Sequence, residues 1–323
     1  MKVANNAEEF ERFMERAAVV SRRYPVVISK YFDSSVEAEM DCASDGRNVI
    51  GVSMQHIEEA GVHSGDSTII TPFFHEKGVK KKMNDAALSL AREMEIRGPF
   101  NIQFLIKDGD PYIIELNLRA SRSMPFSSKS VGINMVDYGV KGITGRFDWS
   151  EFYEPDHKSY AAKSAQFSWS QIKGAYPLLG PEMRSTGEAA SMGTSLNDAL
   201  LKSWLSINPN RIPEKAILLY GSPGRKDVED CARSLSDFDL LTLKGAEASN
   251  VEVKSAEEAI EAMREGEVGM LVTQDDMRST DYSVRRTAAD LNIPMVLNFR
   301  LAQALAAAFK DRHISVKELR EYW

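Results

Sequence analysis

The sequence predicts an α/β fold in two parts, an α+β lobe followed by a small Rossmann-like domain with a parallel sheet. In the first half, apolar residues alternate along strand-like segments that can pair as hairpins, as at 36–46 and 48–57. From residue 215 onward, strand and helix patterns alternate regularly, which is typical of a parallel sheet with helices on both faces. At 323 residues, the chain is long enough to form two separate cores.

The composition of the chain argues against nucleic-acid-binding, membrane-spanning and secreted proteins. The chain is 43% hydrophobic and 27% charged, and its net charge of -7 gives no reason to expect general affinity for nucleic acid or anionic membranes. No apolar run reaches the roughly 18 residues that span a bilayer. The first residues predict a charged amphipathic helix rather than a signal peptide. Cys42 and Cys231 lack metal-site spacing, and we expect a reducing cytoplasm.

The periodicity predicts the elements of both parts in order. In the first part these are a helix at 7–22, strands at 25–32, 36–46 and 48–57, a helix within 76–96, a hairpin at 101–117, a Ser-rich loop and a helix from about 134. In the second part they are strands at 216–221, 238–243, 268–274 and 293–298, which alternate with helices at 227–235, 255–266, 282–292 and 300–309. The stretch between the two parts has weak periodicity and is expected to be a connecting region.

The hairpin at 101–117 carries polar residues where its alternation calls for core. Glu115 and Asn117 are two positions apart and share a face, and Gln103 joins them only if it pairs with Glu115. That register leaves a three-residue loop at 108–110. A two-residue loop would instead pair Gln103 with Ile114 and send the polar groups to opposite faces. We therefore predict the three-residue loop.

Two amide oxygens and a carboxylate on one face form a hard-oxygen site that suits Mg²⁺. Arg119 and Arg122 follow directly, within reach of a transferring phosphoryl group. Upstream, Gly61 and Gly65 bracket short polar residues, and glycine allows close approach of the backbone to a ligand. The alternatives are a half-exposed hairpin with a polar face and an ordinary loop.

Taken together, these motifs resemble the carboxy-terminal part of the large subunit of carbamoyl phosphate synthetase. The resemblance rests on FDSSVEAEMDCASDG, QHIEEAGVHSGDS, GPFNIQFLIKDGDPYIIELNLRASRSMPFSSKSVGI and PLLGPEMRSTGE, in collinear order. It implies a partial second ATP-grasp unit at 1–146, a connecting region at 147–212, and a methylglyoxal-synthase-like allosteric domain at 213–323. The last assignment rests on pattern and position more than on motif.

The resemblance implies an ATP-grasp ligase, a carbamoyl phosphate synthase of the glutamine-hydrolysing type that phosphorylates carbamate for pyrimidine and arginine biosynthesis. The implied cofactors are ATP with Mg²⁺ or Mn²⁺, and K⁺ is a further candidate. The implied partners are the rest of the large subunit, a glutamine amidotransferase small subunit, ATP and carbamate, with no nucleic acid and no membrane.

The resemblance also implies roles for individual residues. Glu37 would hold the ribose hydroxyls, and the backbone at Lys30 and Phe32 would lie near the adenine. The nucleotide site would further include Gly61, Val62, His63, Ser64, Gln103 and Glu115. The metal ligands would be Gln103, Glu115 and Asn117, and the catalytic residues would be Arg119 and Arg122.

The sequence departs from the family pattern in three ways. The Gly-rich loop that would cover the phosphates, and the subdomain before it, do not occur in residues 1–323, so we expect the isolated chain to be inactive. Leu118 stands where the family has proline. In the last domain, Leu243, Ala246 and Val272 occupy positions of phosphate donors. The remaining candidates for an anion site are Ser222, Arg225, Lys226, Lys244 and Thr273. We expect weak, salt-sensitive anion binding there and no tight site for UMP or IMP.

Two rival interpretations stay open. Another ATP-grasp ligase, such as a biotin-dependent carboxylase subunit, is disfavoured by NLRASRSMPF and GPEMRSTGE. A non-catalytic assembly or regulatory module derived from such an enzyme is kept open by the missing Gly-rich loop.

Overall fold

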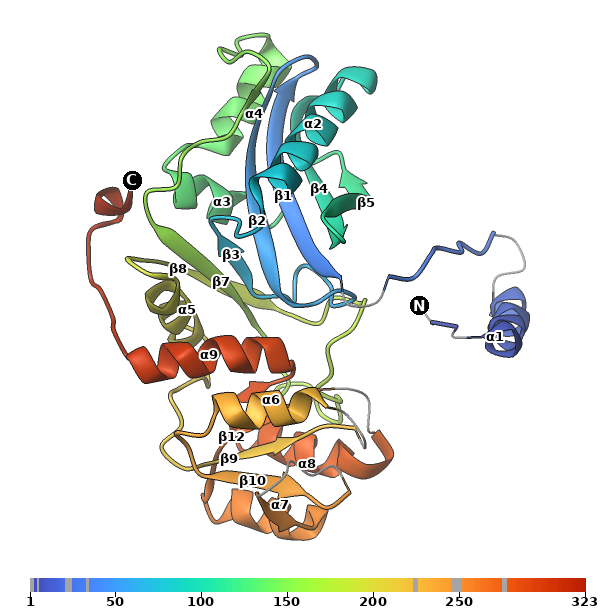
Figure 1. Ribbon diagram of the computed structural model, residues 1–323, viewed down its shortest axis with the longest axis vertical. Helices are drawn as coiled ribbons and strands as arrows, with labels where there is room; N and C mark the ends of the chain where they lie inside the picture. The colour runs from blue at the N-terminus through green and yellow to red at the C-terminus, as the bar shows by residue number, and fades with distance from the viewer. Residues whose placement is uncertain are drawn as a thin grey trace.

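The computed structural model describes residues 3–4, 6–20, 25–32, 35–222, 226–245, 251–274 and 278–323. Within these ranges the chain forms a largely antiparallel sheet and a separate parallel sheet (Figure 1), as the sequence predicts. Among the described residues, no helix is long and apolar enough to cross a membrane.

The first sheet has eight strands in the described part of the chain. Their order is β5-β4-β1-β2-β3-β7-β8, with β6 paired in parallel to β2. The strands are β1 (Val36–Asp45), β2 (Val49–Glu59), β3 (Ile69–Thr71), β4 (Arg97–Lys107), β5 (Asp110–Asn117), β6 (Phe152–Tyr153), β7 (Tyr160–Gln166) and β8 (Gly187–Gly193).

Alternation along β1 sends its side chains to two different environments. Ala38, Met40 and Cys42 are fully buried in the apolar cluster that also holds the buried residues of α2 (Lys77–Glu93). Glu39 and Asp41 point to the opposite face, because successive side chains of a strand alternate. Helices α3 (Met124–Val131) and α4 (Met135–Thr144) close part of that second face with their own apolar cluster. The Ser-rich segment expected as a loop thus contains helix α3.

Residues 147–212 contain regular structure that their weak periodicity did not predict. Strands β7 and β8 extend the first sheet through β3, and α5 (Leu196–Leu205) packs on both of them. In β7, Lys163 and Ser164 are buried at consecutive positions, so its polar pattern does not resemble that of a half-buried strand.

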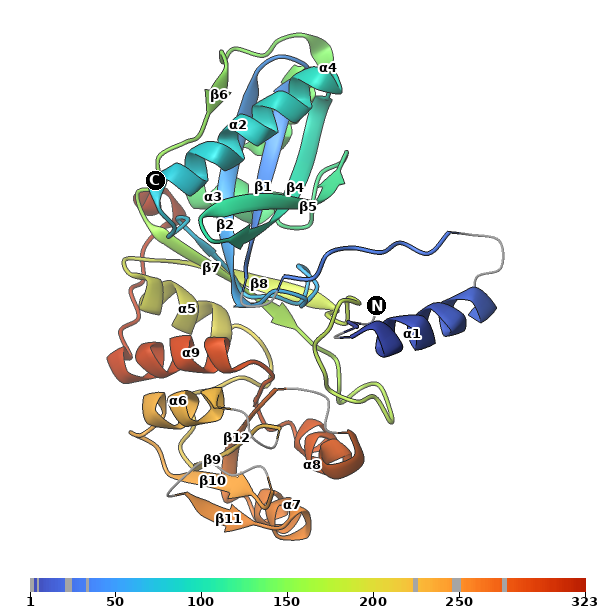
Figure 2. The ribbon, with the colours of Figure 1, turned by 45° about the vertical axis from the view of Figure 1, so that its right-hand side comes forward.

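The amino-terminal residues extend away from the sheets (Figure 2). Helix α1 (Ala7–Val20) confirms the predicted helix, whose last expected residues lie outside the described ranges. The predicted strand at 25–32 is wrong, because these residues belong to no strand and Val27 is 87% exposed. An apolar alternating segment forms a strand only when a neighbouring strand pairs with it.

The second sheet is parallel and has the order β11-β10-β9-β12-β13 among the described residues. Its strands are β9 (Ala216–Tyr220), β10 (Leu240–Leu243), β11 (Glu252–Lys254), β12 (Val268–Thr273) and β13 (Met295–Val296). Helices α7 (Ala256–Arg264) and α8 (Arg278–Asp290) cover one face, and α6 (Asp227–Ser234) and α9 (Phe299–Asp311) cover the other. The predicted helices on both faces are confirmed, and β11 is an additional edge strand.

Helix α9 joins the two sheets, since it packs on α5 of the first part and on strands of the second (Figure 1). A single apolar cluster includes residues from β7, α5, β9 and α9. The chain end then returns to the first part through the short 3₁₀ helix η1 (Leu319–Tyr322), where Tyr322 is buried. The two parts therefore share a continuous core.

Candidate active site

The β4–β5 hairpin has the predicted pairing but not the predicted loop. Gln103 lies directly across from Glu115, and Asn101 lies across from Asn117. Lys107 pairs with Asp110, which leaves a two-residue loop of Asp108 and Gly109 with φ angles of 51° and 80°. Two positive φ values are the signature of the tight Asp-Gly hairpin turn. The three-residue loop was therefore a wrong prediction.

A β-bulge reconciles the short loop with the correct pairing. Between Gln103 and Phe104 the register shifts, and Phe104 pairs with Ile113. Ile114 is the extra residue on β5, and its insertion moves Glu115 back opposite Gln103. The simple loop arithmetic failed because it assumed an uninterrupted ladder.

The polar residues of three neighbouring strands share one face of the first sheet. Glu39 of β1 lies across from Gln103, and Asp41 lies across from Asn101. Directly opposed residues of antiparallel strands point to the same side of the sheet. The face shared with Glu115 thus holds carboxylates and amides from β1, β4 and β5.

The loop between β2 and β3 lies against this face. Ser64 accepts a hydrogen bond from Gln103 Nε2 at 2.9 Å, so the two sequence motifs meet in space. The Glu37 carboxylate accepts a hydrogen bond from the Gly61 backbone. Gly61 has φ +103°, and a Cβ built there would meet nothing within 4 Å, so backbone conformation requires glycine.

Asp66 fixes the far end of this loop. Its carboxylate is 2% exposed and accepts hydrogen bonds from the backbone amides of Arg184 at 2.9 Å and Ser185 at 2.8 Å. The His63 amide donates to Gly180 O at 2.8 Å. The GDS end of the motif is thus an anchor, while Gly61 and Ser64 contact Glu37 and Gln103 on the polar side of the sheet.

Burial changes the charge state of the acids around Glu37. Burial, together with the nearby charges of Glu58 and Glu115, raises the pKa of Glu37 to about 7, although the Gly61 hydrogen bond acts in the opposite direction. Burial also raises the pKa of Glu58 to about 7. His56, 3.9 Å from Glu37, has its pKa lowered to about 3 by burial, and neither of its ring nitrogens has a hydrogen-bond partner among the described residues.

A buried network under the arginine-bearing segment was not recognised in the sequence. Asp41 is 0% exposed and accepts hydrogen bonds from Asn101 Nδ2 and Ser127 Oγ, both at 2.9 Å, and from Ser121 Oγ. Ser121 lies between Arg119 and Arg122 in the sequence, so Asp41 ties that segment to β1. The sequence signal for this network was the group of serines after the hairpin, which the sequence analysis interpreted only as a Ser-rich loop.

The two arginines lie at the edge of the polar face. Arg119 Nη2 donates to Asn117 Oδ1 at 3.2 Å. An Arg122 guanidinium nitrogen is 3.7 Å from Glu188, which also lies 3.4 Å from the ammonium of Lys163. The Lys163 side chain is only 2% exposed, whereas both arginines are exposed. Lys163 is a basic group close to the candidate site that sequence reasoning missed.

Glu39 is a buried acid on this face whose hydrogen bonding, with Ser123 and Asn101, is incomplete. One of its carboxylate oxygens has no partner among the described residues. Burial and the charge of Asp41 together raise its pKa to about 8, although Lys163 acts in the opposite direction. A buried carboxylate oxygen without a hydrogen-bond partner is costly unless a ligand or cation satisfies it.

The expected adenine-side residues lie beside β5. The Phe32 ring lies 4.7 Å from the Tyr112 ring, and the Lys30 ammonium lies 5.1 Å from the Phe32 centroid. Val62 is half-buried on the loop. Lys30 is exposed, and its ammonium lies over the ring of Phe32.

The donor set on the hairpin fits a hard divalent cation that keeps other ligands. Gln103 uses its amide nitrogen toward Ser64, which orients its oxygen elsewhere, and Glu115 supplies the charge. Mg²⁺ binds through one or two carboxylates and completes its shell with water and substrate phosphates. Among the described residues, no group of three or more His, Cys, Asp and Glu could hold a metal ion, so a cage of protein acids is not the arrangement here.

The expected anion site of the second sheet is only partly assembled. Lys226 and Lys244 are exposed, and Ser222 is half-buried. Thr273 is 0% exposed, and its hydroxyl oxygen lies 3.5 Å from Arg285 Nη2. Arg225 and Ala246 lie outside the described residues. Leu243 and Val272 are buried at the ends of their strands, as expected for apolar replacements.

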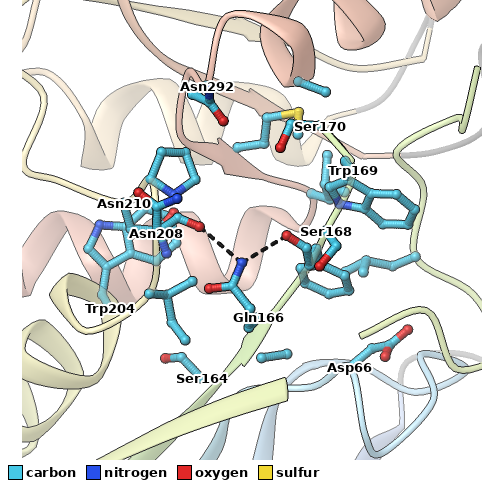
Figure 3. Close-up of a pocket in the computed structure, with 18 of the residues that line it drawn as sticks. Asp66, Ser164, Gln166, Ser168, Trp169, Ser170, Trp204, Asn208, Asn210 and Asn292 are labelled. Atoms are coloured by element: carbon cyan, nitrogen blue, oxygen red, sulfur yellow. Dashed lines mark hydrogen bonds between the residues drawn. The ribbon is translucent and has the colours of Figure 1, made fainter. Parts of the chain in front are cut away.

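A small cavity of about 100 Å³ lies where the first sheet meets the second part of the chain (Figure 3). Gln166 spans it, donating hydrogen bonds to Phe167 O at 2.8 Å and Asn208 O at 3.0 Å. Glu58 and Asp66 also line it, so it borders the back of the candidate site.

Comparison with known proteins finds one matching family model and several similar chains. Residues 1–146 match the family model of the carbamoyl-phosphate synthase L chain, ATP binding domain. The carbamoyl phosphate synthase large chains of Sulfolobus acidocaldarius and Saccharolobus solfataricus are 48% and 49% identical to this chain over 329 and 330 residues. Each alignment covers 100% of this chain and 31% of the relative, so the chain spans less than a third of the curated relatives it matches.

Among solved structures, similarity is lower. The biotin carboxylase domain of the Hydrogenobacter thermophilus 2-oxoglutarate carboxylase, in complex with ADP, magnesium and bicarbonate, aligns with TM-score 0.44 and 17% identity. That alignment covers 51% of this chain and 38% of the other. The biotin carboxylase subunit of a pyruvate carboxylase aligns with TM-score 0.45 and 14% identity, covering 64% of this chain and 53% of the other.

Proposed function

We propose that this chain is the carboxy-terminal portion of a carbamoyl phosphate synthase large chain, in which it takes part in the phosphorylation of carbamate by ATP. The observation that carries the proposal is the meeting of two of the sequence motifs on one sheet face, where Gln103, directly across from Glu115, donates a hydrogen bond to Ser64. Identity of 48–49% to such large chains over the whole of this chain supports it.

In this proposal, residues 1–146 contribute part of the second ATP-grasp unit, 147–212 connect it, and 213–323 form the methylglyoxal-synthase-like allosteric domain. The first sheet continues through β7 and β8, so the connecting region also supplies Glu188, which lies 3.7 Å from Arg122. Pyrimidine and arginine biosynthesis, a glutamine amidotransferase partner and a cytoplasmic location belong to the same proposal.

Each residue has a chemical task in the proposed reaction. Glu37 holds the ribose hydroxyls, and Gly61, Val62, His63 and Ser64 shape the nucleotide site. Gln103, Glu115 and Asn117 would hold Mg²⁺ or Mn²⁺, which supplies charge neutralisation at the phosphates when bound. Phosphoryl transfer needs positioning and electrostatic stabilisation rather than a protein nucleophile, and no covalent intermediate on the chain is required.

The arginines act on the group that moves. Arg119 is oriented by Asn117, and Arg122 is oriented by Glu188, so both guanidinium groups are aimed by neighbours on the site. They stabilise the negative charge on the transferring phosphoryl group. Asp41 holds the segment between them and is a positioning residue.

K⁺ is a further ion in the proposal. A monovalent cation would stabilise the charged forms of Glu37 and Glu58, whose pKa values are raised mainly by burial. Mn²⁺ is proposed as an alternative to Mg²⁺ on the basis of ligand type alone.

The test uses a chimeric large chain in which residues 1–323 replace the matching segment of the Saccharolobus solfataricus relative. Reversal of the proposed step forms ATP from ADP and carbamoyl phosphate, with the phosphoryl group passing from carbamate oxygen to ADP. We expect Mg²⁺-dependent ATP formation by the chimera and none by the isolated chain. A folded chimera that forms no ATP, while the unmodified relative does, would contradict the proposal.

A further inference from the structure

The segment between β7 and β8, residues 167–186, contacts two distant parts of the molecule. Its first half lies on helix α8 of the second part, and its second half lies on the 61–67 loop of the candidate site. Neither contact is needed to form the strands that the segment connects. The contacts therefore place a physical link between the second sheet and the loop proposed to line the nucleotide site.

At the α8 end, the contacts are buried and polar. Tyr176 OH donates to Asp281 Oδ1 at 2.8 Å, and Arg285 Nη1 donates to Pro177 O at 3.0 Å. The Arg285 guanidinium also lies 5.2 Å from the centre of the Tyr176 ring. On the outer side of the helix, Arg286 donates to two more backbone carbonyls of the segment.

Arg285 is the central group of this contact. Its side chain is 0% exposed and is ion-paired through Nε to Asp281 Oδ2 at 2.6 Å. Its Nη2 donates to Gln274 O at 3.2 Å, immediately after β12. The planar guanidinium of Arg285, a fork of N–H donors with fixed directions, thus holds both the end of β12 and the carbonyl of Pro177.

A buried ion pair is weak evidence for stability, because desolvation of the two charges offsets much of their attraction. Its geometric effect is specific, since each donor of a guanidinium has a fixed direction. The Asp281–Arg285 pair therefore specifies the position of Pro177 more than it stabilises α8.

The other end of the link is only three residues away. Gly180 O accepts the hydrogen bond of the His63 amide at 2.8 Å, and only Leu178 and Leu179 separate Gly180 from Pro177. A chain of this length between two fixed carbonyls has little freedom to change its span. A displacement of Pro177 would therefore move Gly180, and with it the acceptor of the His63 amide, by a similar distance.

We propose that Arg285 is a positioning residue for the 61–67 loop, acting through the Pro177–Gly180 stretch and the His63 amide. The inference rests on the proposed function where it assigns this loop to a nucleotide. It gives the second part of the chain a direct structural effect on the candidate site, through contacts of packed groups.

The experiment compares three variants of the full 323-residue chain by amide hydrogen exchange. Arg285→Met removes the fork, and Tyr176→Phe removes a single hydroxyl from the same contact. Val284→Ala is the matched control, because Val284 is 0% exposed on the same helix and packs into the core between α7, α8 and the sheet instead. The readout is the exchange rate of the His63 amide relative to buried amides of β1.

In Arg285→Met, we expect the His63 amide to exchange about tenfold faster, as for loss of one hydrogen bond, with β1 unchanged. Tyr176→Phe shifts the rate in the same direction by less, and keeps the test informative if Arg285→Met does not fold. Val284→Ala leaves the ratio unchanged. Unaltered His63 exchange in both contact variants, or an equal effect of Val284→Ala, would overturn the proposal.

A second readout separates this inference from the proposed function. In the ATP-forming chimera, Arg285→Met should raise KM for ADP several-fold with kcat little changed. Faster His63 exchange with unaltered KM would support the positioning role and contradict the nucleotide role of the loop. Faster exchange together with a raised KM would support both.

Discussion

The polar face of the first sheet and the carboxyl end of the second sheet both bury charged side chains, but they satisfy them differently. Among the described residues, Glu39, His56 and Ser67 on or near the first face have buried polar atoms without hydrogen-bond partners. At the second sheet, Arg285 and Asp281 are equally buried but bind each other and their surroundings, although the Nε of the next residue, Arg286, also lacks a partner among the described residues.

The difference indicates which region is built to receive a ligand. Unpaired buried polar groups cost free energy, and they persist where a bound group completes them. A buried pair that already uses its hydrogen bonds leaves less for an incoming anion. The first face therefore has the character of a binding site, and the end of the second sheet has that of a structural contact.

The largest expected effect is on catalytic activity, which compares a residue of the first sheet face with one of the second sheet. In the ATP-forming chimera, Arg122→Met should lower kcat by about 10²–10³-fold, because a donor to the developing phosphoryl charge is lost. Lys244→Met is the matched control at the second sheet, where an exposed lysine is removed, and should change kcat by less than about twofold. Equal effects of the two substitutions in steady-state kinetics would break the comparison.

Stability should respond strongly to Asp41. Its replacement by Ala leaves the donors of Asn101, Ser121 and Ser127 without their acceptor, and we expect the free energy of unfolding to fall by about 3 kcal/mol. Asp41→Asn keeps one acceptor oxygen and should cost less. Urea denaturation of both variants measures this, and a cost below about 1 kcal/mol for Asp41→Ala would show that the network is not formed.

Stability should also depend on pH in a defined window. Burial raises the folded-state pKa of Glu37 and Glu58 to about 7 and of Glu39 to about 8. An acid whose pKa is raised by folding stabilises the folded state fully at pH values below its unfolded-state pKa, near 4.5. This stabilisation is lost as the pH rises through its folded-state pKa. His56 has a lowered pKa, so its contribution is already complete above its usual value of 6.5.

Between pH 6.5 and 8.5, we therefore expect the free energy of unfolding to fall by about 3 kcal/mol. Glu39→Gln should flatten this dependence, because the acid with the highest raised pKa no longer titrates. Chemical denaturation across the window provides the measurement. A constant or rising stability would mean that partners not identified here satisfy these carboxylates.

The smallest expected effect concerns the hairpin turn. Gly109→Ala should destabilise the chain by about 1 kcal/mol, because its φ of 80° is unfavourable for a residue with a Cβ, although open space surrounds it. Gly78→Ala is the matched control, since Gly78 lies in α2 with open space around it. Alanine favours a helix more than glycine does, so this variant should be slightly more stable than the unmodified chain. Thermal unfolding of the two variants should give shifts of opposite sign.

Sequence reasoning succeeded where local pattern and neighbouring contacts agree. The regular alternation after residue 215 predicted the parallel sheet, and the polar positions of Gln103 and Glu115 predicted their pairing. The loop was wrong because a bulge at Ile114 leaves no local signal in the sequence. The strand expected at 25–32 shows the converse error, because strand pattern alone does not supply a partner strand.

Other features were hidden because they depend on contacts between segments distant in sequence. Asp281 and Arg285 are four positions apart on a helix, a spacing that usually indicates an exposed ion pair. Lys163 lies in a polar stretch that reads as a loop until β3 and β8 pair with it. The role of Asp66 as an anchor depends on backbone amides more than 100 residues away.

The most direct measurement of the central claim is a crystal structure of the ATP-forming chimera with ADP and Mg²⁺. The account predicts the nucleotide between the 61–64 loop and the β4–β5 hairpin, with the metal ion bound to oxygens of Gln103, Glu115 and Asn117. It further predicts that the Asp281–Arg285 pair stays intact without nucleotide beside it. Nucleotide and metal bound at the second sheet, with the hairpin oxygens uncoordinated, would contradict the account.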